Sequence, residues 1–185
     1  TSGLITVSLL PKAVAGMSIL GVNPNTGNVG TLVAVTANVT TANGNYDVYF
    51  DQDLSASGTA NASSVSATFV VPQTKAGDHN VTVIDVATHD NATATFTVTT
   101  SYSLVIPAMA KPLQENDSIP ISINITGGES GKTYVANITV QAPTNVSYVN
   151  MLNVGTSTLG NGTAIANYPS DFSAGANTSF VGNYA

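Results

Sequence analysis

Residues Ser64–Val98 read SVSATFVVPQTKAGDHNVTVIDVATHDNATATFTV and decide the fold class. Apolar and polar residues alternate in three successive runs within it, at Ser64–Val71, His79–Val83 and Ala92–Val98. Alternation with a period of two residues is typical of half-buried β-strands. The segments between the runs carry Gly, Asp and Asn, which favour turns. The stretch therefore predicts a three-stranded meander that forms half of a β-sandwich.

Similar runs occur on both sides of this stretch. Further strands are expected at Met17–Val22, Thr31–Thr40, Tyr46–Phe50, Tyr102–Ile106, Ile119–Thr126, Thr133–Gln141 and Val146–Val154. The segments Pro24–Gly30 and Asp51–Ser63 are expected to be a turn and a polar connection. We predict an all-β protein with two immunoglobulin-like β-sandwich domains in tandem, residues 14–100 and 101–185, after an extra N-terminal strand in residues 1–13.

The N-terminal strand is predicted from a short alternating run. Ile5, Val7 and Leu9 alternate with small hydroxyl residues, and Pro11 closes the run. Such a strand has two interpretations. It is either an edge strand folded back on its own domain, or a donor strand that pairs with another copy of the chain.

The second predicted domain lacks its last strands in this sequence. Val181-Gly182-Asn183-Tyr184 is similar to Ala76-Gly77-Asp78-His79, after which the first domain has two more strands, whereas the sequence stops at Ala185. Either the chain is truncated there, or this sandwich keeps an open groove. An open groove exposes apolar core and unpaired backbone groups, which need a partner.

Composition excludes several classes of function. Charged residues are only 8% of the chain, against about 25% in ordinary soluble proteins. The net charge of −6 disfavours a nucleic-acid partner. There is no Cys, so the core depends on packing, and no apolar run approaches the ~20 residues of a membrane span. Because the sequence begins at Thr1 rather than Met, we expect that a leader has been removed.

The sequence contains ten Asn-x-Ser/Thr sequons, which begin at Asn38, Asn61, Asn80, Asn91, Asn116, Asn124, Asn137, Asn145, Asn161 and Asn177. On a strand the Asn and the hydroxyl residue share one face, and the middle residue points to the other. The middle residues include Val39, Val81, Ile125, Ile138 and Val146, which we expect to point inward. Each Asn then faces water, as a glycan acceptor must. We predict an extracellular, cell-surface protein whose low surface charge is replaced by covalent N-glycans, with no other cofactor.

Several short segments of the first domain resemble IPT/TIG-type immunoglobulin-like repeats of prokaryotic surface proteins. They are Val29-Gly30-Thr31, Phe50-Asp51, Ser66-Ala67-Thr68-Phe69, Val71-Pro72, Ala76-Gly77, Val81-Thr82-Val83 and Thr93-Ala94-Thr95-Phe96-Thr97-Val98. The resemblance covers the domain from end to end. It implies a spacer or adhesion module without catalytic residues.

Two motifs suggest ligand chemistry but have simpler interpretations. Gly127–Thr133, GGESGKT, resembles a phosphate-binding loop, but Thr126 stands where that motif needs its first Gly. A strand pattern follows it instead of a helix, so we predict a Gly-rich hairpin turn. Asp47, Asp51 and Asp53 could gather oxygen ligands for calcium, but an ordinary polar loop is the favoured interpretation.

The two histidines do not form a catalytic or metal-binding pattern. His79 is expected in the core or at a strand edge, and His89 in a loop. Asp85 and Asp90 lie near His89 in sequence, but turn formation explains both. We therefore predict no catalytic, cofactor-binding or metal site, and no enzymatic activity.

The leading functional hypothesis is a structural subunit of a heavily N-glycosylated extracellular filament. Inserting the N-terminal strand of one copy into the open groove of the next gives a head-to-tail contact, and such contacts build filaments when they do not close. This architecture is similar to that of archaeal thread-type pili. The alternatives are the outer part of an S-layer or stalk protein, and a cell-surface adhesion or carbohydrate-binding module.

Overall fold

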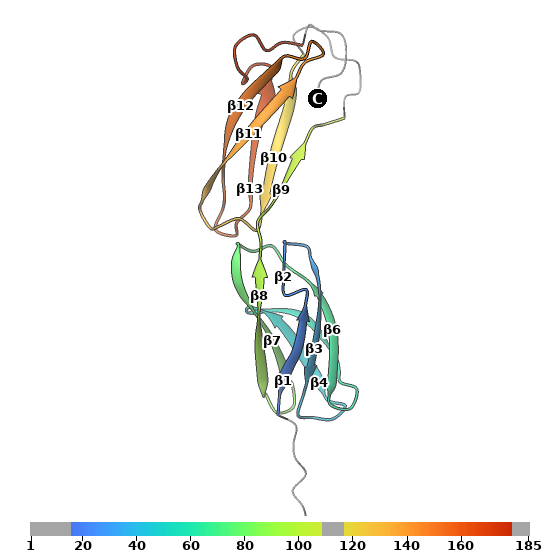
Figure 1. Ribbon diagram of the computed structural model, residues 1–185. Helices are drawn as coiled ribbons and strands as arrows, with labels where there is room; N and C mark the ends of the chain where they lie inside the picture. Colours follow the sequence, from blue (N-terminus) through green and yellow to red (C-terminus); the bar gives the residue numbers. More distant parts are fainter. Residues whose placement is uncertain (1–15, 109–116, 179–185) are drawn as a thin grey trace, which may run out of the picture. The chain divides into compact units, whose positions relative to one another are not determined.

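The computed structural model describes residues 16–108 and 117–178, and these ranges are all-β (Figure 1). The strands are β1 Ser18–Asn23, β2 Thr26–Gly27, β3 Leu32–Asn38, β4 Asn45–Phe50, β5 Asp53–Thr59, β6 Ser64–Val70, β7 Gly77–Asp85, β8 Asn91–Val98, β9 Ser101–Val105, β10 Ile119–Thr126, β11 Thr133–Gln141, β12 Ser147–Gly155 and β13 Gly162–Tyr168. The predicted fold class is confirmed at this level. No helix that could cross a membrane occurs in these two ranges.

The chain divides into two compact units. One takes its described residues from Thr1–Asn23, Ala34–Phe69 and Asn80–Ala94, and the other from Pro24–Val33, Val70–His79 and Thr95–Ala185. The two domains expected from the sequence, residues 14–100 and 101–185, stay a prediction.

The strands of residues 18–98 form two sheets, in the orders β1-β3-β6 and β2-β8-β7-β4-β5. The predicted meander is therefore wrong, because β6 lies in one sheet while β7 and β8 lie in the other. Directly after β6, Val71 donates its N–H to the carbonyl of Thr31, the residue before β3. Pro72 follows and has no N–H to donate, so the pairing of β6 with β3 does not continue beyond this point. Alternation shows which residues of a strand face the core, but it does not show which strand is the neighbour.

Facing side chains connect these two sheets through a shared core. The rings of Phe50 on β4 and Phe69 on β6 lie 5.8 Å apart between centroids. The hydroxyl of Tyr46, also on β4, donates a hydrogen bond of 3.1 Å to the carbonyl of Ser66. Burial follows the expected alternation on β3 and β6, where every second residue is buried.

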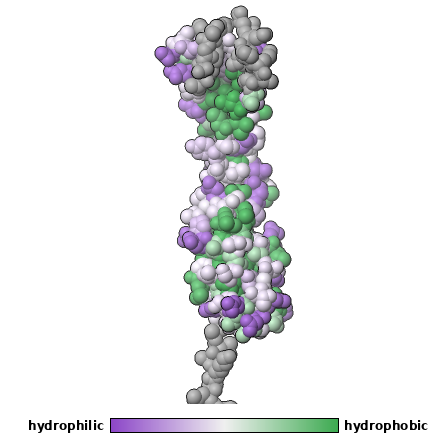
Figure 2. Space-filling model, turned by 90° about the vertical axis from the view of Figure 1, so that its right-hand side faces the viewer, coloured by the Kyte–Doolittle hydropathy of each residue, from purple (hydrophilic) through white to green (hydrophobic). Residues whose placement is uncertain are grey.

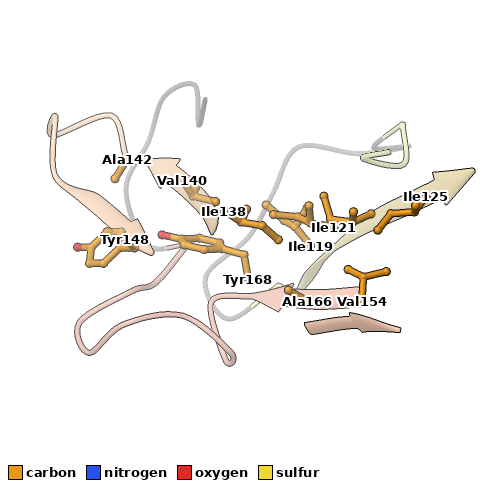
Figure 3. Packing of buried hydrophobic residues seen from close by; sticks show 11 residues of the cluster. Ile119, Ile121, Ile125, Ile138, Val140, Ala142, Tyr148, Val154, Ala166 and Tyr168 are labelled. Atoms are coloured by element: carbon orange, nitrogen blue, oxygen red, sulfur yellow. The ribbon is translucent and has the colours of Figure 1, made fainter. Parts of the chain in front are cut away.

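The strands from β9 to β13 form a three-stranded sheet, β13-β10-β9, and a two-stranded sheet, β11-β12. Their core is an apolar cluster in which all four isoleucines of β10 are buried. Figure 3 shows three of them, Ile119, Ile121 and Ile125, gathered with residues of β11, β12 and β13. Tyr168 is fully buried, and its ring lies 6.2 Å from that of Tyr148 and 5.2 Å from that of Phe172. These aromatic contacts close one end of the cluster.

Candidate functional site

In the second pair of sheets, one edge of β11 has no partner strand among the described residues. In the first pair, β4 lies between β5 and β7 and hydrogen-bonds to both. Over the described residues, β11 pairs only with β12, and β9 is likewise an edge strand, since its partner is β10. Unpaired edges present backbone N–H and C=O groups that can accept a further strand.

An apolar pocket of about 420 Å³ lies beside this edge. Its lining comes from the residues that follow β8 and from β9, β10, β11 and β12: Thr100, Tyr102, Leu104, Ile123, Ile125, Tyr134, Val135, Ala136, Asn137, Ile138, Thr139 and Val154. We call this pocket and the free edge of β11 the β11 groove. On the face shown in Figure 2, apolar surface (green) gathers in the upper part of the picture, over the sheet that contains β9.

Two side chains of β9 show that the groove is open on its core side. Tyr102 pairs in register with Ile125, and Leu104 with Ile123, so both share the face of β10 that points into the core. In the first pair of sheets the core-facing residues of the edge strand β1, Ile19 and Val22, are half-buried. Tyr102, by contrast, is 81% exposed and Leu104 is 55% exposed. The groove can therefore accept an extended segment with an apolar residue at every second position.

The residues predicted to fill such a groove, Ile5, Val7 and Leu9, lie outside the described residues, as does the sequon residue Asn116. The other nine sequon Asn residues are all at least partly accessible. Exposed positions are Asn61, Asn80, Asn91, Asn137, Asn145 and Asn161, and intermediate ones are Asn38, Asn124 and Asn177. Every described sequon can therefore present its Asn to solvent.

The inward direction expected for the middle sequon residues holds on strands and for Val39, which directly follows β3. Val39, Val81, Ile125 and Ile138 are buried. Val146 is 48% exposed, so the prediction for this residue is wrong. The reason is local: Asn145 has a φ of 63° in the turn that precedes β12, and Val146 comes before the first residue of that strand.

Asp85 is the one carboxylate among the described residues that is completely buried. It accepts hydrogen bonds from Thr41 N–H at 2.7 Å, Thr40 Oγ1 at 2.9 Å and Ala87 N–H at 3.0 Å. Burial alone raises the pKa of a carboxyl group, but these donors outweigh it and lower the pKa of Asp85 to about 2. Asp85 thus stays ionised and hydrogen-bonds to the loop after β3 and to the loop after β7. Its bond to Ala87 agrees with its predicted role in a turn.

The remaining motifs have structural roles. The Gly127–Thr133 segment joins β10 to β11, which lie in different sheets, so the predicted hairpin turn is wrong. The strand that follows is β11, and within the loop Lys132 Nζ lies 3.3 Å from Glu129 Oε2. A phosphate-binding loop needs a helix N-terminus at this point.

The acidic and histidine candidates do not converge on a metal site. No group of three or more metal-ligating side chains occurs in the described ranges, which include Asp47, Asp51 and Asp53. His79 is buried on β7, with Nε2 3.0 Å from the carbonyl oxygen of Lys75. His89 lies in the loop after β7 with a φ of 61°. Both histidines are placed as the sequence predicted.

The sequence matches no protein family model, and a search of curated proteins gives no match. Function is therefore inferred from the groove and the surface of the chain.

Proposed function

We propose that the chain is a structural subunit of an N-glycosylated extracellular filament. Residues 4–10 of one copy would enter the β11 groove of the next and pair with the free edge of β11. The observation that carries this proposal is the exposure of Tyr102 and Leu104, core-facing residues beside an edge that is unpaired in the described part of the chain. We expect no enzymatic activity.

The order of the strands supports an immunoglobulin-like origin of the groove. Interleaved orders such as β1-β3-β6 and β2-β8-β7-β4-β5 arise from Greek-key connections of the kind found in immunoglobulin-like sandwiches. In the second pair of sheets, β9, β10 and β13 take the places of β1, β3 and β6, while β11 and β12 take those of β4 and β5. No described strand takes the places of β7 and β8, so the groove is where those strands would lie.

The composition of residues 4–10 suits a strand that lies in the β11 groove. Ile5, Val7 and Leu9 present an apolar side chain at every second position, and Thr6 and Ser8 between them are small and polar. Burial of each apolar side chain stabilises a complex by roughly 1.5–3 kcal/mol. Backbone pairing with β11 adds to this and covers an edge that otherwise favours aggregation.

The first experiment tests which face of residues 4–10 is needed for polymer formation. We expect Val7→Asp to abolish the polymer, because it places a charge among apolar groove residues. Ser8→Asp is the matched control, since its side chain points the other way, and it should still polymerise. Electron microscopy and size-exclusion chromatography measure the polymer, and circular dichroism checks the fold.

Two results would contradict the filament proposal. Polymer formation by Val7→Asp would show that this strand does not join the copies. Unfolding of an isolated monomer by Val7→Asp would show that the strand belongs to its own chain.

A second candidate is the outer part of an S-layer or stalk protein, in which the same polypeptide fills its own groove. The similarity of Val181-Gly182-Asn183-Tyr184 to Ala76-Gly77-Asp78-His79 favours it, because the latter residues include the start of β7. Intact mass of the native protein after deglycosylation separates the candidates. A mature chain that continues well beyond Ala185 favours the stalk.

A further inference from the structure

The outer face of the β11–β12 sheet carries exposed apolar side chains, of which Val149 and Met151 lie outside the β11 groove and Val135 borders it. On β11, Ile138 and Val140 are buried in the core, so Val135, Asn137 and Thr139 point to the opposite face. The register pairs Val135 with Asn153, Asn137 with Met151, and Thr139 with Val149. On this outer face Val135 is 60%, Val149 45% and Met151 73% exposed.

Asn137 lies in the middle of these three apolar residues. Met151 is directly opposite it on β12, Val135 is two positions before it on β11, and Val149 is its diagonal neighbour. Directly opposed residues in an antiparallel pair have Cβ atoms about 4.5–5.5 Å apart, and diagonal neighbours are about 7–8 Å apart. A sugar attached to Asn137 Nδ2 would therefore start within reach of all three side chains.

We propose that an N-glycan on Asn137 covers this outer face, with its first sugars resting on Met151, Val135 and Val149. The inference rests on the proposed N-glycosylation but not on strand exchange. Both groups that a glycosylation enzyme recognises, the Asn137 amide and the Thr139 hydroxyl, are exposed on this face. Sugar rings have apolar C–H faces, and an uncovered apolar face on a two-stranded sheet favours aggregation.

The test compares loss of this glycan with loss of another strand glycan. Asn137→Gln removes the first, and Asn80→Gln is the matched control. Asn80 is exposed on β7, and its neighbours on the same face of that strand are Asp78 and Thr82. The probe is hydrogen peroxide, which oxidises accessible Met to the sulfoxide. Peptide mapping of the natively glycosylated protein follows Met151, with Met17 as an internal reference.

We expect Met151 to oxidise severalfold faster in Asn137→Gln than in the wild type, with no change at Met17. Asn80→Gln should leave both rates unchanged. Binding of a fluorescent apolar dye should rise in Asn137→Gln only. It should return to the wild-type value when Met151→Thr and Val149→Thr are added, because these two positions of the outer face, which do not line the groove, are then polar.

Three outcomes would overturn the proposal. Glycopeptide mass spectrometry could find Asn137 unmodified in the wild type. Met151 could oxidise at the same rate in the wild-type monomer and in Asn137→Gln. Met151 could be protected only in the polymer, in which case the face is an interface between copies. A failure of strand exchange leaves the monomer result unchanged, so the two proposals fail separately.

Discussion

At the scale of single residues, Asp85 is the side chain on which we expect stability to depend most clearly. Asp85→Asn removes the charge and replaces one acceptor oxygen by an amide donor, while the loop donors Thr40, Thr41 and Ala87 remain. We expect the free energy of unfolding at pH 7 to fall by about 2 kcal/mol. Asp53→Asn, at an exposed edge position, should change it by less than about 0.5 kcal/mol. Urea denaturation measures both values.

The lowered pKa of Asp85 also sets the sign of a pH effect. Its pKa falls from 3.8 to about 2 on folding, so the unfolded chain binds this proton more readily. The ionised Asp85 carboxylate therefore stabilises the folded state fully above pH ~4, and this stabilisation is lost as the pH falls toward ~2. In the Asp85→Asn variant, the free energy of unfolding should lack this part of its pH dependence. Parallel loss of stability in wild type and variant between pH 4 and pH 2 would show that Asp85 does not contribute it.

At the scale of strands, the free edge of β11 should accept an added strand. A synthetic peptide of residues 1–13 should bind a variant that lacks these residues, and it should slow hydrogen exchange of amides in Thr133–Gln141. The same peptide with Val7→Asp should have no effect. Exchange that slows only outside β11 would place the peptide elsewhere. Mass spectrometry of peptic fragments measures this.

The strands also show how far the sequence predicts this fold. Ile119–Thr126 and Thr133–Gln141 were predicted to the residue, because strict alternation marks strands with one buried face. β5 was missed because this edge strand is polar and has no buried residue, and β13 because its Ala and Asn residues have low β-propensity. The sequence suggested an open groove as one of two interpretations, but it did not identify the residues that line it. The core-facing direction of Tyr102 follows from its pairing with Ile125, a long-range contact that alternation does not reveal.

At the scale of the whole molecule, solubility should depend on the glycans more than on charge. Only 8% of residues are charged, and exposed apolar side chains such as Leu20, Leu32 and Met151 remain on the described surface. Enzymatic deglycosylation of the native protein should therefore lower its solubility sharply. The midpoint of thermal unfolding should change little, because the described cores contain no sequon Asn. Light scattering measures the solubility and circular dichroism the unfolding. Occupancy of two or fewer sequons, or equal solubility with and without glycans, would mean that the protein surface itself keeps the chain in solution.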